Sequence, residues 1–337
     1  MKAMKRLLLL IKLRLVLFVA PLARSGARIV AEFAARVVAR IPGNPYYQVF
    51  DRHGFHLLRH HYYLPIPEKS DLTGGFWDKT SDLVGLDMND RGWLHLLETV
   101  IPCYLDEFRS AFPLYATDDP RQFYLINGAY MAVDAHVYYA LIRHYQPKRI
   151  VEVGVGHSTM LAGAACLRNR ERTGRGVNLT AIDPFPWDQN EAERIPGLSQ
   201  MIVARVQDVD RAVFTSLESG DILFVDSSHV LRTGGDVQEI YLEILPRLGA
   251  GVLVHIHDIS LPRSYPRVYY EDQLFWNEQY VLQAFLAFNA RFEVLWPGNY
   301  LMTKHPEKIC AAFPEFEIMR HHYPVSEPSA FWMRTRS

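Results

Sequence analysis

Cysteine is scarce in this sequence. Its three cysteines, Cys103, Cys166 and Cys310, lie far apart and form no CxxC pair. This spacing argues against a disulfide framework and fits reduced, buried thiols in a cytosolic protein. Long apolar runs are also missing, because the longest clean run, residues 15–23, is far shorter than the roughly 20 residues that span a membrane.

The chain also lacks an overall charge bias. Its 36 lysines and arginines nearly balance 37 aspartates and glutamates, for a formal net charge of -1. We therefore expect no nucleic-acid partner, since such partners select basic surfaces. The 337 residues, 49% hydrophobic and 22% charged, indicate a soluble globular protein with one large or two modest domains.

Residues 1–40 depart from this neutrality. They hold nine lysines and arginines against one acid, Glu32, and nine minus one leaves +8 on a leucine-rich segment. The segment imitates a signal peptide, but Lys12 and Arg14 interrupt its apolar stretch. The pattern is typical of a basic amphipathic helix on an anionic membrane face. We expect a cytoplasmic protein with peripheral contact at the inner face of the cytoplasmic membrane. A helix packed on a partner subunit, or a cleaved signal, would show the same pattern.

Beyond residue 40 the sequence shows two patterns of predicted secondary structure. Residues 41–147 mix loops with helical spacing at residues 91–112 and 127–147, which predicts a helical cap or lid. Residues 148–337 alternate strands and helices, which predicts an α/β, doubly wound sheet covered on both faces. The expected strands are residues 149–153, 178–183, 200–206, 221–226, 250–257, 291–296 and 330–335. Helices are expected to start near Ser158, Asn190, Asp210, Gly235 and Glu271.

The first of these strands breaks into a glycine turn, "VEVGVGHST". Glu152 lies inside the strand, Gly154 and Gly156 follow it, and Ser158 and Thr159 are expected to cap the next helix. Glycines let the backbone approach a ligand closely, and ligands of doubly wound sheets bind outside the carboxyl ends of the strands. The third glycine of a dinucleotide fingerprint is missing, which disfavours a nicotinamide dehydrogenase.

The next two strand ends carry further polar groups. Asp183, followed by Pro184, ends the second strand, where a carboxylate can accept hydrogen bonds from a ribose diol. Gln207 and Asp208 follow the third strand and are placed to border an adenine. The three strand ends together predict a nucleoside site.

The motifs "VEVGVGHST", "AIDPF" and "VQDV" resemble, in order and spacing, those of class I S-adenosylmethionine-dependent methyltransferases. The resemblance covers residues 127–335 and implies a Rossmann-like, seven-stranded methyltransferase sheet with an N-terminal helical extension. It implies that the amino acid end of S-adenosylmethionine lies near residues 152–156 and the ribose near Asp183. The segment "NGAYMAVDAH" resembles the part that folds over the cofactor, where Tyr130 and Asp134 are candidate contacts.

A second polar cluster follows the fourth and fifth strands, in "VDSSH" and "HIHD". If these strands are neighbours, Asp226 and Asp258 lie about one strand spacing apart, roughly 4.8 Å, and would repel each other unless a cation or a proton lies between them. Mg²⁺ prefers such oxygen ligands. His229, three residues after Asp226, suits a general base. His255 shares a face with His257 and is expected to be a satisfied core histidine.

This cluster resembles metal-dependent sugar O-methyltransferases and cephalosporin-hydroxylase-like proteins. The resemblance implies that Asp226, His257 and Asp258 are metal ligands and that His229 is the catalytic base. An acid is usual where this chain has His257, and imidazole suits a softer metal than Mg²⁺. The same segment also resembles a broad group of bacterial methyltransferases.

These observations predict a methyltransferase that transfers a methyl group from S-adenosylmethionine to a hydroxyl of a sugar, glycan or glycolipid, as in polysaccharide biosynthesis. A divalent metal, with Mg²⁺ the first candidate, would assist, and we expect a homo-oligomer. The loop at residues 260–280, with aromatics and Arg263 and Arg267, would form a sugar-stacking lid or pack on the cap. Two rivals remain: an iron oxygenase with two histidines and one carboxylate, and a non-catalytic nucleoside-binding protein.

Overall fold

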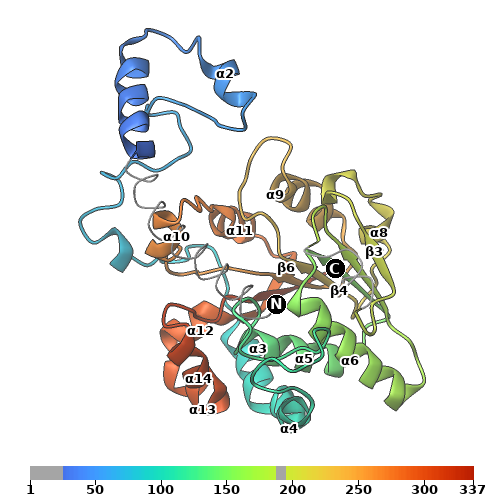
Figure 1. The fold of residues 1–337 in the computed structure, drawn as a ribbon. Helices are drawn as coiled ribbons and strands as arrows, with labels where there is room; N and C mark the ends of the chain where they lie inside the picture. The colour runs from blue at the N-terminus through green and yellow to red at the C-terminus, as the bar shows by residue number, and fades with distance from the viewer. Residues whose placement is uncertain (1–25, 187–194) are drawn as a thin grey trace, which may run out of the picture. The chain divides into compact units, whose positions relative to one another are not determined.

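The computed structural model describes residues 26–186 and 195–337. The described chain divides between Ile66 and Pro67 into two units. In the first, residues 26–40 form a helix that precedes the short α2 (Tyr47–Asp51) (Figure 1). No helix within the described ranges is long and apolar enough to cross a membrane. The helix expected near Asn190 lies outside the described residues.

The second unit is built on a seven-stranded sheet with the order β3-β2-β1-β4-β5-β7-β6. β7 runs antiparallel to β5 and β6, whereas the other ladders are parallel. The strands are β1 (Arg149–Val153), β2 (Asn178–Ile182), β3 (Gln200–Ile202), β4 (Ile222–Val225), β5 (Leu253–Ile256), β6 (Phe292–Pro297) and β7 (Phe331–Thr335). All seven expected strands are present, and the predicted α/β doubly wound fold is confirmed. β3 is shorter than expected, because the chain turns into a 3-10 helix at Val206–Asp208.

Helices cover both faces of this sheet, as the apolar strands predict. In β4, Ile222 and Phe224 face one core, whereas Leu223 and Val225 face the other. The first core contains residues of α3 (Asp90–His95), α4 (Pro102–Ala111), α5 (Asp134–Tyr145) and α6 (His157–Thr173). It also contains residues of α12 (Gly298–Lys304), α13 (Pro306–Ala312) and α14 (Glu315–His322). The second contains residues of α8 (Ala212–Thr215), α9 (Asp236–Glu239) and α11 (Glu278–Leu286).

Three expectations about local structure were wrong. The helix expected over residues 127–147 begins only at Asp134, because the Asn127 side chain accepts hydrogen bonds from the next turn and fixes it as a loop. Glu271 ends α10 (Arg267–Glu271) rather than starting a helix. Cys103 is exposed, since it lies on the outer side of α4, and of the three cysteines only Cys166 is buried.

One buried histidine makes the fold sensitive to acid. His136 on α5 packs against the rings of Phe108 and Phe313, with centroid distances of 4.2 and 5.3 Å. Burial lowers the pKa of His136 to about 4, although Glu315 partly opposes this effect. The imidazole is therefore neutral in the folded protein and charges readily once the chain unfolds.

We expect this histidine to reduce stability as pH falls. The unfolded chain binds more protons between the unfolded pKa of 6.5 and the folded pKa of about 4, so stability is lost through that window. The loss between pH 7 and pH 5 is about 2 kcal/mol. Urea unfolding measures the free energy of unfolding of the wild-type protein and of His136→Phe. This free energy should depend less steeply on pH in the variant. An equal pH dependence of the unfolding free energy in both proteins would contradict a buried, neutral His136.

Candidate active site

A glycine turn joins β1 to α6 at the point where the strand order reverses. Gly154 has φ +99°, and a Cβ there would lie 2.9 Å from the backbone oxygen of Asp226. Only glycine therefore lets the ends of β1 and β4 approach so closely. Gly156 is extended, with nothing within 4 Å of a built Cβ, and its N–H donates to Thr159 Oγ1 at 3.1 Å. Gly156 is the N-cap, so Ser158 lies in the first turn and is not a cap as expected, whereas Thr159 caps the helix from its third position through this hydrogen bond.

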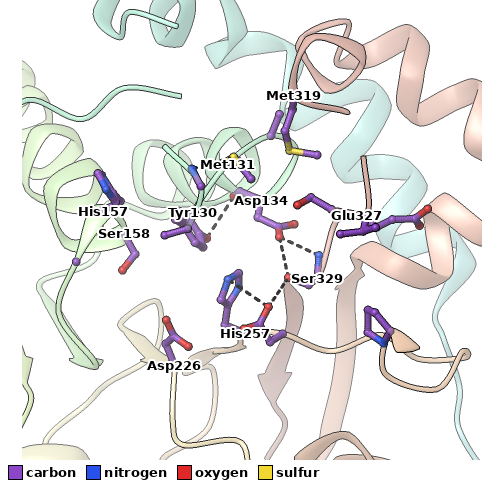
Figure 2. A pocket seen from close by; sticks show the side chains of 18 of the residues that line it. Tyr130, Met131, Asp134, His157, Ser158, Asp226, His257, Met319, Glu327 and Ser329 are labelled. Atoms are coloured by element: carbon purple, nitrogen blue, oxygen red, sulfur yellow. Dashed lines mark hydrogen bonds and ion pairs between the residues drawn. The ribbon is translucent and has the colours of Figure 1, made fainter. Parts of the chain in front are cut away.

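The turn borders a cavity of about 1130 Å³ at the carboxyl ends of the strands (Figure 2). Ser158 lines it, together with Val155 and His157, whereas the backbone of Gly154 lies behind the wall. The acidic lining residues are Asp119, Asp134, Asp226, Asp258 and Glu327, and the arginines are Arg263 and Arg267. This excess of acids favours ligands that carry positive charge, such as a sulfonium or a metal ion.

Two carboxylates and an imidazole meet at one side of this cavity. Since β4 and β5 are adjacent, Asp226 after β4 and Asp258 after β5 come together as expected. His229 Nε2 lies 3.2 Å from Asp226 Oδ1 and 3.5 Å from Asp258 Oδ2. Ligand atoms from these three residues all lie within 4.8 Å of one another.

His229 is held firmly in this cluster. Its Nδ1 is 2.9 Å from Glu278 Oε2, and Glu278 is fully buried. Its ring also packs against Trp276 at 4.3 Å. The backbone of His229 is left-handed, with φ +59°, as is that of Asp258 with φ +55°. Non-glycine residues adopt this conformation at a cost of about 1–3 kcal/mol, and such strain concentrates at functional sites.

The cluster shifts the pKa values of its own members. Burial would lower the pKa of His229, but hydrogen bonds to Asp226 and Glu278 and the charge of Asp258 raise it well above its ordinary value. Burial would raise the pKa of Asp226, but the hydrogen bond from His229 and the charges of His257 and His229 lower it. The imidazolium and the carboxylates therefore stabilise each other in their charged forms.

The two histidines of "HIHD" differ in their surroundings. His257 lines the cavity, and its Nε2 lies 3.8 Å from Asp258 Oδ1, but it does not join the three residues whose ligand atoms converge. His255 shares its face, with ring centroids 5.5 Å apart, and stacks on Phe224 at 4.1 Å. His255 is core-facing as expected but is not satisfied, since neither ring nitrogen has a hydrogen-bond partner among the described residues.

A buried carboxylate above the cluster connects to Asp258 through a serine. Asp134 Oδ2 accepts hydrogen bonds from Ser329 N and Oγ at 2.8 and 3.3 Å. Ser329 Oγ also lies 3.2 Å from Asp258 Oδ1. Tyr130 lines the same part of the cavity and donates to the carbonyl oxygen of Asp134 at 3.3 Å. Burial raises the pKa of Asp134.

Glu152 of the first motif lies behind the cavity and does not line it. It is completely buried, and Tyr138 Oη donates to its Oε1 at 2.6 Å. Burial raises the pKa of Glu152 to about 7, against the opposing effect of Thr159 and Tyr138. The carboxyl group therefore joins β1 to α5 and α6 in the interior, through Tyr138 and Thr159.

The residues predicted for the ribose and adenine lie outside the cavity wall. Asp183 Oδ2 accepts from Val155 N at 3.2 Å, and its Oδ1 accepts from Phe185 N at 2.7 Å, so the carboxylate ties the second strand end to the glycine turn. Pro184 lies between Asp183 and Phe185 in the chain. Gln207 donates to the carbonyl of Gly234. Asp208 pairs with Arg205, at 2.7 Å.

The aromatic loop after β5 forms the outer wall. Tyr265 and Tyr269 line the cavity, as do Arg263 and Arg267. Arg263 pairs with Glu327 at 3.1 Å, which fixes the loop against the segment before β7. The loop also packs on Trp77, whose ring is 6.5 Å from that of Tyr270, as the second interpretation expects, and the sugar-stacking role stays a prediction.

Some residues of this site gave no signal in the sequence. Glu278 is 49 positions from His229, and Ser329 is 71 positions from Asp258, and neither belongs to a short motif. Phe185 follows Asp183 inside a recognised motif, yet its 86% exposure emerges only from the fold.

Comparisons with known proteins bear on this arrangement. Residues 151–259 match a family model described as a methyltransferase domain. An uncharacterized protein of Archaeoglobus fulgidus is 31% identical over 189 residues, which cover 53% of this chain and 83% of that protein. A structure of the plantazolicin methyltransferase BpumL in complex with SAH has 11% identity and TM-score 0.38, covering 59% of this chain and 82% of that one. The CmcI-N160 apo-structure has 14% identity and TM-score 0.32, covering 67% and 89%.

The matched segment runs from β1 through the "HIHD" motif and contains the glycine turn and all three clustered residues. The sheet has the seven strands that the resemblance implied, with β4 beside β5. The chain belongs to the class I S-adenosylmethionine-dependent methyltransferases. It is an enzyme, and S-adenosylmethionine is its methyl donor.

Proposed function

We propose that this enzyme methylates a hydroxyl group of a sugar, glycan or glycolipid, with His229 as base and a divalent cation beside it. The observation that carries the proposal is the convergence of Asp226, His229 and Asp258, of which the two aspartates line the cavity that the glycine turn borders. The acceptor oxygen attacks the methyl carbon in line with the sulfonium. The carbon–sulfur bond breaks, sulfur keeps the electron pair, and the hydroxyl proton passes to His229 Nε2.

The residues present fit a small divalent cation. Ligands of Mg²⁺ lie about 2.1 Å from the ion, so two of them are separated by up to about 4.2 Å. The ligand atoms of Asp226, His229 and Asp258 lie within 4.8 Å of one another, close to that span. Asp226 and Asp258 would hold the cation, which lowers the pKa of a bound hydroxyl and orients it. His257 lines the same cavity but lies outside the converging group, so its role as a third ligand stays a prediction.

His229 has the orientation that a base requires. Glu278 occupies Nδ1, which fixes the ring and leaves Nε2 toward the two aspartates. Because these carboxylates raise the pKa of His229, it keeps a proton in their presence. A cation on Asp226 and Asp258 offsets their charge and thereby favours the neutral, basic imidazole.

The outer wall supports the choice of acceptor. Tyr265 and Tyr269 line the cavity with aromatic rings, and Arg263 and Arg267 offer donors, which together suit the apolar faces and hydroxyls of a sugar ring. The two-histidine iron site of an oxygenase is less well supported, because the converging group has one histidine and two carboxylates.

Methyl transfer to purified glycans tests this function directly. With S-adenosylmethionine labelled on its methyl group, we expect a methyl ether on a sugar hydroxyl, loss of activity with a chelator and recovery with Mg²⁺. His229→Ala should lower kcat by about 10²–10⁴-fold and flatten its pH profile. Full activity of this variant with an unchanged profile would rule out the base assignment.

Phe185 gives a prediction for the cofactor end. Its exposed ring follows Asp183 at the second strand end, where an adenine can stack on it. Stacking of a base on an aromatic side chain contributes about 1–3 kcal/mol. Phe185→Ala should therefore weaken S-adenosylhomocysteine binding by about 5- to 150-fold in calorimetry. Phe288→Ala, which removes an equally exposed phenylalanine that follows α11 and not the second strand, should leave it unchanged.

Ser329 gives a prediction for the metal. Its hydroxyl lies between Asp134 and Asp258 and fixes the orientation of the proposed ligand. Loss of such an outer contact costs about 10- to 100-fold in metal affinity. Ser329→Ala should weaken Mn²⁺ binding, followed by electron paramagnetic resonance, by that factor. Ser326→Ala, in the same segment, removes a hydroxyl without a described hydrogen bond and should have no effect.

A further inference from the structure

The helix of residues 26–40 carries an apolar face that no described residue of its own unit, within residues 26–66, covers. Ile29, Phe33 and Val37 recur every four residues, and Val30 lies beside them. Their exposed fractions are 70% for Ile29, 71% for Phe33, 41% for Val37 and 67% for Val30. Isolated helices of this length are marginal in water, and such a stripe normally packs on something.

The unit holds this helix in place without using that face. Arg59 donates to the carbonyl oxygens of Val38 and Ala39 at 2.9 and 3.1 Å, and also to that of Ile41. The guanidinium thus satisfies orphan carbonyls at the helix C-terminus and complements the negative end of its dipole. The contact fixes the helix by its end and leaves the apolar stripe exposed.

Charge identifies the occupant of this face. Arg28, Arg36 and Arg40 lie on the same helix with one acid, Glu32, and residues 1–40 together carry nine basic residues against that single acid. Further along the unit, Tyr62 and Tyr63 are 91% and 87% exposed. Apolar side chains flanked by arginines, with exposed tyrosines, match the interface of an anionic bilayer, where acyl chains meet charged headgroups.

We propose that the helix of residues 26–40 binds the surface of an anionic membrane. The apolar stripe enters the headgroup region, and the arginines contact lipid phosphates. This surface is separate from the methyl-transfer site and would bring the enzyme to acceptors that are themselves attached to lipid.

Vesicle co-sedimentation of the full chain tests the proposal. We expect binding to phosphatidylcholine vesicles that contain phosphatidylglycerol, little binding to phosphatidylcholine alone, and release by high salt. The double variant Ile29→Ser, Phe33→Ser should lower partitioning at least about tenfold. Val84→Ser, which changes a side chain of 70% exposure outside this unit, is the matched control and should leave it unchanged.

Replacing Arg28 and Arg40 together by glutamine should also weaken binding to the anionic vesicles about tenfold or more. Unchanged S-adenosylhomocysteine binding by every variant shows that the fold and the cofactor site are intact. Equal binding to both kinds of vesicle, or no binding to either, would overturn the proposal. A dimer in solution that the Ile29→Ser, Phe33→Ser variant dissociates, with no vesicle binding, would assign the face to a second copy of the chain instead.

Discussion

Asp226→Asn is expected to lower kcat for methyl transfer about 1000-fold while the affinity for S-adenosylhomocysteine changes less than about threefold. Asp226 is a proposed ligand of the cation and lies 3.2 Å from the proposed base. The amide keeps the shape of the side chain but removes its charge, so both contributions weaken together. Steady-state kinetics with a saturating methyl donor, together with calorimetric titration, would measure the two quantities separately.

Asp119→Asn is the matched control for this prediction. Asp119 also lines the cavity, but it pairs with Arg121 at the surface and lies outside the metal cluster. We expect kcat within about twofold of the wild-type value, since surface ion pairs contribute little. Comparable losses in both variants would show that the cavity needs negative charge in general and not a ligand at Asp226.

Gly154→Ala is expected to destabilise the protein by about 2–5 kcal/mol. The residue has φ +99°, and the new Cβ would lie 2.9 Å from a backbone oxygen of the neighbouring strand end, which cannot move as a flexible side chain would. Left-handed strain and overpacking each cost about 1–3 kcal/mol. Thermal unfolding should show a markedly lower midpoint.

Gly156→Ala, in the same turn, distinguishes an effect on stability from an effect on cofactor binding. Gly156 is extended and has no atom within 4 Å of a built Cβ, so its stability should stay within about 0.5 kcal/mol of wild type. Weaker S-adenosylhomocysteine binding with unchanged stability would show that the cofactor passes over this glycine. A large loss of stability in Gly156→Ala, or none in Gly154→Ala, would contradict this account of the turn.

The sheet was predictable because its strands are buried on both faces. The runs "ILFV" and "VLV" are apolar throughout, and a polar residue follows each, so strands and strand ends both show in the sequence. The three helices between β6 and β7 were not predicted, since residues 298–322 lack a long apolar period. The start of α5 was also predicted too early, because the Asn127 side chain stabilises a turn in a segment where the apolar spacing continues.

Within the site, residues close to strand ends could be predicted, and their partners could not. Asp226 and Asp258 follow adjacent strands, and His229 follows the first of them by three residues. Glu278 and Ser329 reach the cluster from distant segments, and only the folded chain brings them there. The sequence also suggested His257 for the metal, whereas the structure brings His229 nearer to both carboxylates.

Calorimetric titration of S-adenosylmethionine and S-adenosylhomocysteine, with and without Mg²⁺, tests the central claim most directly. We predict saturable binding of both ligands by the full chain, and a separate heat of Mg²⁺ binding that Asp226→Asn abolishes. Absence of binding by both ligands would contradict the account of the cavity as a methyl-transfer site. Binding of both ligands with a Mg²⁺ heat that survives in Asp226→Asn would contradict the placement of the metal.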